Sequence, residues 1–320
     1  MQLVRQKPKT TRIIAFAAAS VAAFLAAPVT ASAKTEDTFF NSVIPSRIDH
    51  LIGFTPTTYA IHPLGQPVVP ITVRVGGRTH RYTFGNAAAV VGPSANIYLK
   101  NMIRGRRSPS PQGVFLDRRL KKAERRQLKV RLDLARDADV MAVSSGHPAC
   151  SVGVSRAAAR GIAAGTIRMW SQAGVPTPAG GDAIALRRAG TGTDRFVEPR
   201  FGAGYKLPSG ARAVRDGGLS EAAAGDTAVA AVTSWSRARA FQGATCAVPI
   251  GGSAPTDASV RTLSHPDAYP ISFVTLKRLR SVRPIVAAFV KYLTGTRATS
   301  SFRQRGMLLR KEEWSATPGP

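Results

Sequence analysis

Two neighbouring stretches, GIAAGTIRMWSQAG at residues 161–174 and ALRRAGTGTDRF at residues 185–196, decide how this chain is interpreted. The first places Ile167 and Trp170 directly after a helix-ending Gly165, which is a distinctive turn. The second leads from a short strand through a Gly-Thr turn into a predicted helix. The start of a helix presents free N–H donors and binds anions well. The pair therefore predicts a defined turn beside an oxyanion site.

Alternating strand and helix signals surround these stretches. Residues 155–165 predict a helix that is capped by Ser155 and ends near Gly165. Residues 191–201 begin another helix, which Pro199 ends or kinks. Apolar runs predict buried strands at residues 139–145, 182–188 and 227–234. This alternation is typical of an α/β domain.

The flanking segments carry further signals. Residues 71–77 and 80–84 alternate apolar and polar side chains around a Gly-Gly pair, which predicts a β-hairpin. A short basic helix is expected over residues 116–127, with a strand over residues 128–135. Pro and Gly bracket a helix over residues 283–295, and a second helix and a short strand follow it.

Residues 1–33 have the composition of an export signal. Four bases in the first twelve residues precede an apolar run of about 15 residues, and the small residues Ala31, Ser32 and Ala33 suit a cleavage site. The run is short for a bilayer span, which favours cleavage over a retained membrane anchor. The mature protein is expected to begin near Lys34 and to be soluble and secreted or extracytoplasmic, in the periplasm or cell wall. No cysteine stands where a lipid anchor would attach.

The chain has two cysteines, Cys150 and Cys246. Exported proteins mature in an oxidising compartment, where two cysteines are more often joined than free. A bridge would close a loop of nearly a hundred residues and add roughly 4 to 5 kcal/mol of stability on the chain-entropy estimate. Two buried, unpaired thiols are the alternative.

The chain is strongly basic, with 45 Lys and Arg against 18 Asp and Glu and a formal net charge of +27. Such a charge predicts attraction to polyanions, including anionic lipid head groups and phosphate-rich wall polymers. Eight bases between Arg118 and Arg131 form either a solvated helix face or a docking patch for an anionic surface. No aromatic residue is interleaved with them to stack on nucleic-acid bases, so no specific nucleic-acid partner is expected.

Four ordered blocks share the motifs of one family. RRAGTGT is similar to an Arg followed by Ser-Gly-Thr at a helix start, and AVAAVTS (228–234) to a strand written aIGYv, with alanines in place of Gly-Tyr. AYPISF (268–273) and the closing helices are similar to a YPl segment and its helices. The first block matches an I-F-x-G-x-I-x-x-W turn through Ile162, Gly165, Ile167 and Trp170. Residues 139–310 therefore resemble the phosphate-binding proteins of ABC-type phosphate transporters, a periplasmic-binding-protein-like family.

The resemblance implies a two-lobed α/β fold with mixed β-sheets flanked by helices. Residues 138–250 would form the second lobe with the oxyanion motif, and residues 251–320 would return to the first lobe. Residues 34–137 lack the family's Gly-Ser-Ser and Ser-Gly-Ser-Gly loops, so they form either a diverged first lobe or a separate module. The nearest substitute for these loops contains Ser94.

The candidate ligand site lies in RRAGTGT. The N–H groups of Gly192 and Thr193, with the hydroxyls of Thr191 and Thr193, can hold a tetrahedral oxyanion. An arginine adds a bidentate pair, and the alignment favours Arg188, with Arg187 as the alternative. A threonine that simply caps the helix is the competing interpretation. The family's Asp after the arginine, which accepts a proton from hydrogen phosphate, is missing here.

The resemblance implies non-catalytic binding of inorganic phosphate or a similar oxyanion by a monomer, for import through an ABC transporter permease. The alternative is an envelope-associated protein of the same fold that has lost the small ligand and binds anionic cell-envelope polymers through its basic surface. The sequence has no Gly-x-Ser-x-Gly elbow, no His-Glu-x-x-His motif and no paired metal-ligand spacing. We therefore expect no enzyme activity, cofactor or metal site; a hydrolase built on an unrecognised first domain is the remaining enzymatic reading.

Overall fold

The computed structural model describes most of the chain after residue 112 and shorter segments before it. The described ranges are 35–37, 42–45, 71–75, 77–83, 89–92, 95–105, 113–189, 212–214, 218–278, 283–304 and 306–310. All of them belong to the unit Lys34–Pro320, which is separate from Met1–Ala33. The expected export signal and cleavage site, Ser94, and the helix expected at residues 191–201 lie outside the described ranges. Within those ranges, no helix is long and apolar enough to cross a membrane.

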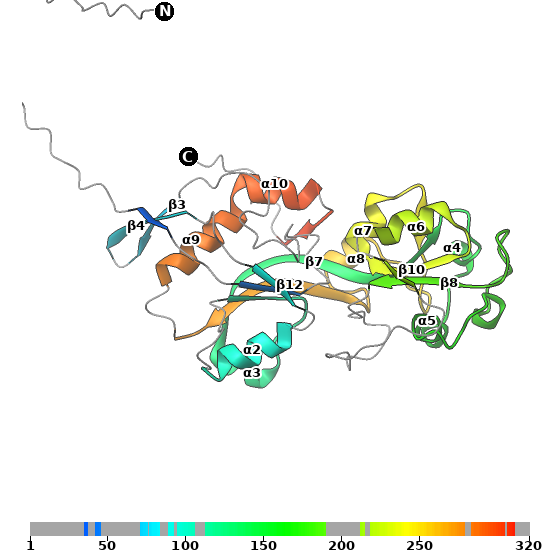
Figure 1. Cartoon of the computed structure of the whole chain (residues 1–320), viewed down its shortest axis with the longest axis horizontal. Coiled ribbons are helices and arrows are strands. Elements are labelled where there is room, and N and C mark those ends of the chain that lie inside the picture. Colours follow the sequence, from blue (N-terminus) through cyan, green and yellow to red (C-terminus); the bar gives the residue numbers. More distant parts are fainter. Residues whose placement is uncertain are drawn as a thin grey trace, which may run out of the picture. The chain divides into compact units, whose positions relative to one another are not determined.

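One long strand, β7 (Leu128–Ser144), runs through most of the sheet (Figure 1). The sequence predicted two strands here, at residues 128–135 and 139–145, and this division is wrong. The polar residues between the two apolar runs do not form a turn, because their charges are neutralised inside the sheet. The buried Arg136 donates to Asp133 at 2.5 and 2.7 Å. A paired charge can remain in a strand that an unpaired one would interrupt.

The first half of β7 belongs to one part of the sheet. It pairs antiparallel with β12 (Ala268–Leu276) and with β13 (Leu308–Leu309). β12 also pairs antiparallel with β6 (Gly113–Leu116). The parallel strands β2 (Ser42–Pro45) and β5 (Ala89–Gly92) continue the sheet beyond β6, which gives the order β5-β2-β6-β12-β7.

The second half of β7 carries the other part of the sheet. It pairs antiparallel with β10 (Val229–Ser234) and with β11 (Thr245–Ala247). β8 (Ala185–Ala189) and then β9 (Arg212–Val214) continue the sheet parallel to β10. Both strands that the sequence predicted in this region are present, and the mixed sheet flanked by helices confirms the expected fold class.

Helices cover both faces of the first part. On one face lie α9 (Arg283–Thr294) and α10 (Thr296–Gln304), the two helices predicted near the carboxyl end. Phe289 of α9 meets Phe273 of β12 edge to face at 5.2 Å between ring centroids, an arrangement that aromatic pairs prefer. α2 (Ala95–Ile103) packs its Leu and Met side chains on the opposite face.

The second part is also covered on both faces. Val140 and Ala142 of β7 face one hydrophobic cluster, whereas Met141 and Val143 face the other, because side chains alternate along a strand. The helices on the Met141 face are α4 (Ala149–Val152), α5 (Arg156–Ala163) and the 3₁₀ turn η2 (Ser171–Ala173). The helices on the Val140 face are α6 (Leu219–Gly225), α7 (Trp235–Ala240) and α8 (Asp257–Arg261).

The predicted hairpin is confirmed in a separate three-stranded sheet. β3 (Ile71–Val75) and β4 (Arg78–Thr83) pair antiparallel, and Gly77 occupies the turn with a φ of 79°. β1 (Thr35–Asp37) pairs parallel with β4. A positive φ is easily adopted by glycine, which explains the Gly at this turn.

The basic helix is shorter than expected. α3 (Lys122–Gln127) has six residues, because Leu116 belongs to β6 and not to the helix. Its start is fixed by Glu124, whose carboxylate accepts a hydrogen bond from the N–H of Lys121 at 2.8 Å and both Nη groups of Arg118 at 2.8 Å. The hydrogen bonds from the Arg118 guanidinium lower the pKa of Glu124 below its ordinary value, so the carboxylate stays ionised.

Candidate functional site

The parallel strands β8 and β10 end at one edge of the sheet. Arg188 lies opposite Val232 in the register, and β10 ends two residues later at Ser234. β8 ends at Ala189, and the chain continues from there to Thr191. Ligands of open α/β sheets bind outside the carboxyl ends of the strands. The sequence motif for an oxyanion therefore begins at the edge where a ligand is expected.

The structure describes the side chain of Arg187 but only the backbone of Arg188. Arg187 is half-buried, and its Nη1 donates to the carbonyl oxygen of Leu186 at 3.3 Å. The backbone of Arg188 is hydrogen-bonded between β10 and β9, opposite Val232 and Ala213. Its side chain lies outside the described residues. So do Thr191, Gly192 and Thr193, and the ligand role of all five residues stays a prediction.

The helix α7 starts directly after β10 at the same edge, and the carboxylate of Asp137 accepts hydrogen bonds from its first turn. Asp137 Oδ1 accepts the N–H of Ser236 at 3.0 Å, and Oδ2 accepts the Ser236 hydroxyl at 2.8 Å. The Asp137 side chain is 1% exposed and also accepts the N–H of Ala138 at 2.9 Å. The two Ser236 donors belong to the first turn of α7, so neither of them is free to bind an external anion. Sequence analysis missed this residue because it lies inside a strand.

A guanidinium group also lies at this edge. Arg156, the first residue of α5, pairs with Asp267 through both Nη atoms, one of them at 3.0 Å. The backbone N–H of Asp139 donates to Asp267 O at 3.2 Å, and Asp139 lies opposite Ser234 in the register. The Asp267 side chain is 1% exposed, whereas that of Arg156 is 38% exposed. The hydrogen bonds to the buried carboxylate raise the pKa of Arg156, so the guanidinium stays charged and neutralises Asp267.

The turn after α5 supports β8 from the core. Gly165 has a φ of 72°, and Trp170 is fully buried in the cluster on the Met141 face. The N–H of Trp170 donates to Asp182 O and the N–H of Ile184 to Arg168 O, both at 2.8 Å. These bonds fix the chain immediately before β8. Residues 161–174 therefore position the strand that carries the two arginines.

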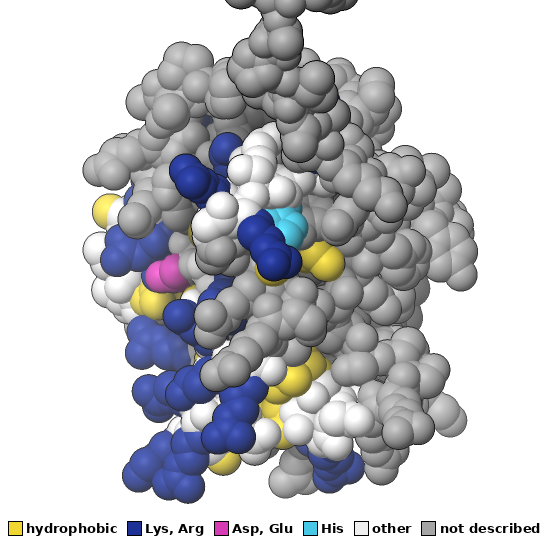
Figure 2. Space-filling view, turned by 90° about the vertical axis from the view of Figure 1, so that its left-hand side faces the viewer, with side chains coloured by type: hydrophobic (Ala, Val, Ile, Leu, Met, Phe, Trp, Pro, Cys, Tyr) yellow, Lys and Arg dark blue, Asp and Glu magenta, His cyan; other side chains and the backbone are white. Residues whose placement is uncertain are grey.

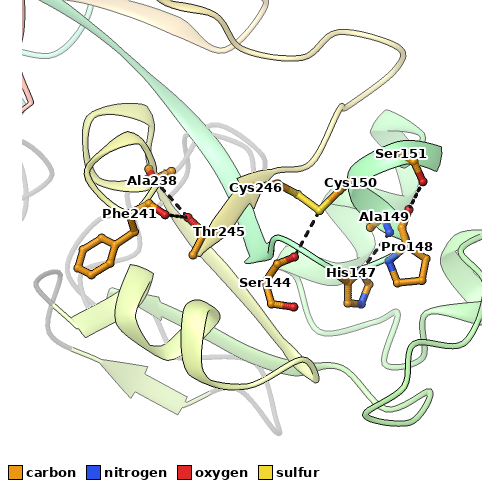
Figure 3. Close-up of a disulfide and its surroundings, with 10 residues drawn as sticks. All are labelled: Ser144, His147, Pro148, Ala149, Cys150, Ser151, Ala238, Phe241, Thr245 and Cys246. Atoms are coloured by element: carbon orange, nitrogen blue, oxygen red, sulfur yellow. Dashed lines mark hydrogen bonds between the residues drawn. A yellow bond between two sulfur atoms is a disulfide. The ribbon is translucent and has the colours of Figure 1, made fainter. Parts of the chain in front are cut away.

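The disulfide between Cys150 and Cys246 is present, which confirms that prediction (Figure 3). It joins α4 to β11 with 6.0 Å between the Cα atoms. Ser144 O lies 3.3 Å from Cys150 Sγ at the end of β7. The bridge therefore closes the far end of the second part of the sheet, away from the Ser234 edge. In the described ranges, no group of three or more His, Cys, Asp or Glu side chains could hold a metal ion.

Buried His147 lies beside this bridge. Its Nδ1 accepts the N–H of Ala149 at 3.0 Å (Figure 3), and its ring lies 4.2 Å from that of Trp170. The side chain is 2% exposed, and burial lowers the pKa of His147. The imidazole is therefore neutral at pH 7 and acts as part of the core.

No protein-family model and no curated protein sequence matches the chain. Solved structures do match it. An ABC-type phosphate transport receptor from Vibrio cholerae is 15% identical, with a TM-score of 0.56 over 85% of this chain and 100% of the other. A possible phosphate-binding protein from Planctomyces limnophilus is 16% identical, with a TM-score of 0.62 over 88% and 95%.

A third structure has its ligand bound. It is described as a phosphate ABC transporter substrate-binding protein with bound phosphate, from Clostridium perfringens, and it is 14% identical, with a TM-score of 0.51 over 86% of this chain and 100% of the other. At these identities the likeness shows the fold alone. The protein has a periplasmic-binding-protein-like fold, and the resemblance to phosphate-binding proteins is confirmed at that level.

Proposed function

We propose that this protein binds phosphate or a related tetrahedral oxyanion, without catalysis, at the carboxyl ends of β8 and β10. The observation that carries the proposal is the parallel pairing of these strands, with Arg188 one residue before the end of β8 and three residues before Thr191 in the sequence. The fold is shared with proteins described as phosphate-binding, one of them with phosphate bound. The shared fold and the sequence motif both support an oxyanion ligand.

Each proposed anion-binding residue has a distinct role. Arg188 supplies a charge-assisted pair, because Arg187 already donates to a backbone carbonyl. The N–H groups of Gly192 and Thr193 and the hydroxyls of Thr191 and Thr193 surround the remaining oxygens. By contrast, the N–H of Ser236 in the first turn of α7 already donates to Asp137 of β7.

The ligand selectivity follows from the missing Asp. A carboxylate beside the anion accepts the proton of hydrogen phosphate and repels fully ionised sulfate. RRAGTGT has no carboxylate between Arg188 and Thr193. We therefore propose weak discrimination between phosphate and sulfate. We also propose that the protein is exported after cleavage near Lys34 and delivers its anion to an ABC transporter permease.

The test is isothermal titration of phosphate and of sulfate into purified protein. We expect a dissociation constant of millimolar or lower for both anions. Arg188→Ala should weaken binding at least about tenfold, since a hydrogen bond to a charged group contributes about 1.5 to 3 kcal/mol. Arg187→Ala is the matched control and should change affinity less than about threefold. Absence of millimolar binding, or equal losses in the two variants, would overturn the proposal.

A further inference from the structure

A groove of about 990 Å³ lies on the first part of the sheet, between α3, β7 and β12. Its lining comes from the segment around α3, the first half of β7, the start and end of β12, and Leu263. None of the described residues at the β8 and β10 edge lines the groove. The groove is therefore a separate feature from the proposed oxyanion site.

Four bases in the groove lining are exposed and have no ion-pair partner in the described part of the chain: Arg119, Arg125, Lys129 and Lys277. Two further bases in the lining are neutralised, because Arg118 pairs with Glu124 and Arg136 with Asp133. In Figure 2, Lys and Arg side chains gather along the lower left of the face shown, with little acidic surface among the coloured residues. The groove therefore has an excess of unneutralised positive charge.

The base of the groove is apolar. Leu128 and Pro270 lie buried beneath it, and Leu120 and Leu263 are partly buried in its wall. Val130 is 43% exposed there, which is unusual for a large aliphatic side chain of a central strand. Carbon-rich surface between exposed cations suits a ligand that alternates anionic groups with short carbon linkers.

We propose that this groove binds a linear phosphodiester polymer with short polyol linkers. Charge complementarity favours a polyanion, because the free bases come from both α3 and the end of β12 and so border the groove on more than one side. Among the described residues, no aromatic side chain lines the groove, so these residues offer no surface for stacking nucleic-acid bases. The apolar base contacts the carbon linkers, which an inorganic polyphosphate lacks.

The experiment measures binding of a fluorescent poly(glycerol phosphate) chain to the full protein at several salt concentrations. The groove variant carries Arg119→Gln, Arg125→Gln, Lys129→Gln and Lys277→Gln. The matched control loses the same four charges at exposed positions outside the groove, through Arg74→Gln, Arg78→Gln, Arg81→Gln and Arg160→Gln. Thermal unfolding of both variants confirms that each is folded, as expected for exposed substitutions.

Four phosphate contacts predict a salt slope of about −3 and a loss of affinity of roughly 50-fold between about 50 and about 200 mM salt, on the single-strand coefficient. The groove variant should lose this salt-dependent part of the binding, and the control variant should keep it. Equal effects of the two variants would overturn the proposal, as would equal binding of poly-glutamate or single-stranded DNA of the same charge.

The proposal is independent of the oxyanion site. Arg188→Ala should leave polymer binding unchanged, and the groove variant should leave phosphate titration unchanged. A protein that binds the polymer but no free phosphate would support the groove and reject the oxyanion site. Loss of polymer binding in Arg188→Ala would reject the groove.

Discussion

Asp137 and Ser236 are joined by two hydrogen bonds in the centre of the fold, at 3.0 Å to the N–H and 2.8 Å to the hydroxyl. They connect the middle of β7 to the first turn of α7. Ser236 in turn lies against the corner after α10, where a Cβ on Gly306 would be 2.6 Å from Ser236 O. One buried carboxylate therefore links the long strand, a helix of the second part and the chain end that returns to the first.

Removal of that carboxylate should be costly. Asp137→Ala removes a buried acceptor of the Ser236 N–H and hydroxyl, although the hydroxyl also lies 2.9 Å from Ser234 Oγ. We expect a loss of about 3 kcal/mol in the free energy of unfolding, measured by urea denaturation. Asp226→Ala is the control, because Asp226 accepts the N–H of Ala228 at 2.9 Å on an exposed loop. The control should lose less than about 1 kcal/mol. Similar losses would contradict the role assigned to Asp137.

A substitution at Gly306 tests how closely the corner after α10 packs against the backbone of Ser236. Gly306 and Gly174 have positive φ angles of 82° and 78°, but a Cβ at Gly174 meets nothing within 4 Å. Gly174→Ala should therefore show the backbone cost alone, about 1 to 2 kcal/mol. Gly306→Ala adds a clash with the backbone of Ser236, so we expect a further 1 to 3 kcal/mol in the same assay. Equal costs would show that the corner moves away freely.

The disulfide closes a loop across 96 residues of sequence. Replacement of Cys150 and Cys246 by Ser should lower the free energy of unfolding by roughly 4 to 5 kcal/mol on the chain-entropy estimate. The wild-type protein under reducing conditions is the control and should behave like the double variant. An unchanged urea midpoint in both cases would contradict the expected stabilisation.

The protein should lose stability in mild acid through His147. Burial lowers its folded pKa below the ordinary value of 6.5, so below that pH the unfolded chain takes up a proton that the folded chain does not. The stability that comes from neutral His147 is complete above about pH 6.5 and is lost as the pH falls to the folded pKa, by at most about 1.4 kcal/mol per pH unit.

His147→Asn keeps an acceptor for the N–H of Ala149 and removes the titrating group. Unfolding measured from pH 7.5 to 5 should be less pH-dependent in this variant than in the wild type. His265 is also buried with a lowered pKa, so His265→Asn should remove a second part of the dependence. Unchanged slopes in both variants would refute this assignment.

The sequence predicts the second part of the sheet better than the first, for physical reasons. The cap at Ser155 and the turn with buried Trp170 are local patterns, and both are present, with Ser155 Oγ accepting the N–H of Ala158 at 3.0 Å. The continuity of β7 was missed because Arg136 and Asp137 are polar, and their partners are identified only by the folded structure.

At the candidate site, too, the sequence predicted features with a local pattern and missed those that depend on distant partners. Local sequence placed Arg188 at the end of a strand, which the structure confirms. Arg156 was missed, because its pairing with Asp267 spans 111 residues and leaves no local pattern. A docking patch was one of two interpretations of the basic cluster around α3, and it stays a prediction. The groove itself was not predicted, because its apolar base depends on Pro270 and Leu263, far away in sequence.

The most direct measurement is a crystal structure of the protein grown with arsenate, with the anion located by the anomalous scattering of arsenic. Our account predicts one arsenate at the carboxyl ends of β8 and β10, within hydrogen-bond distance of Arg188, Thr191 and Thr193. Arsenate bound elsewhere, or an empty edge at millimolar arsenate, would contradict it.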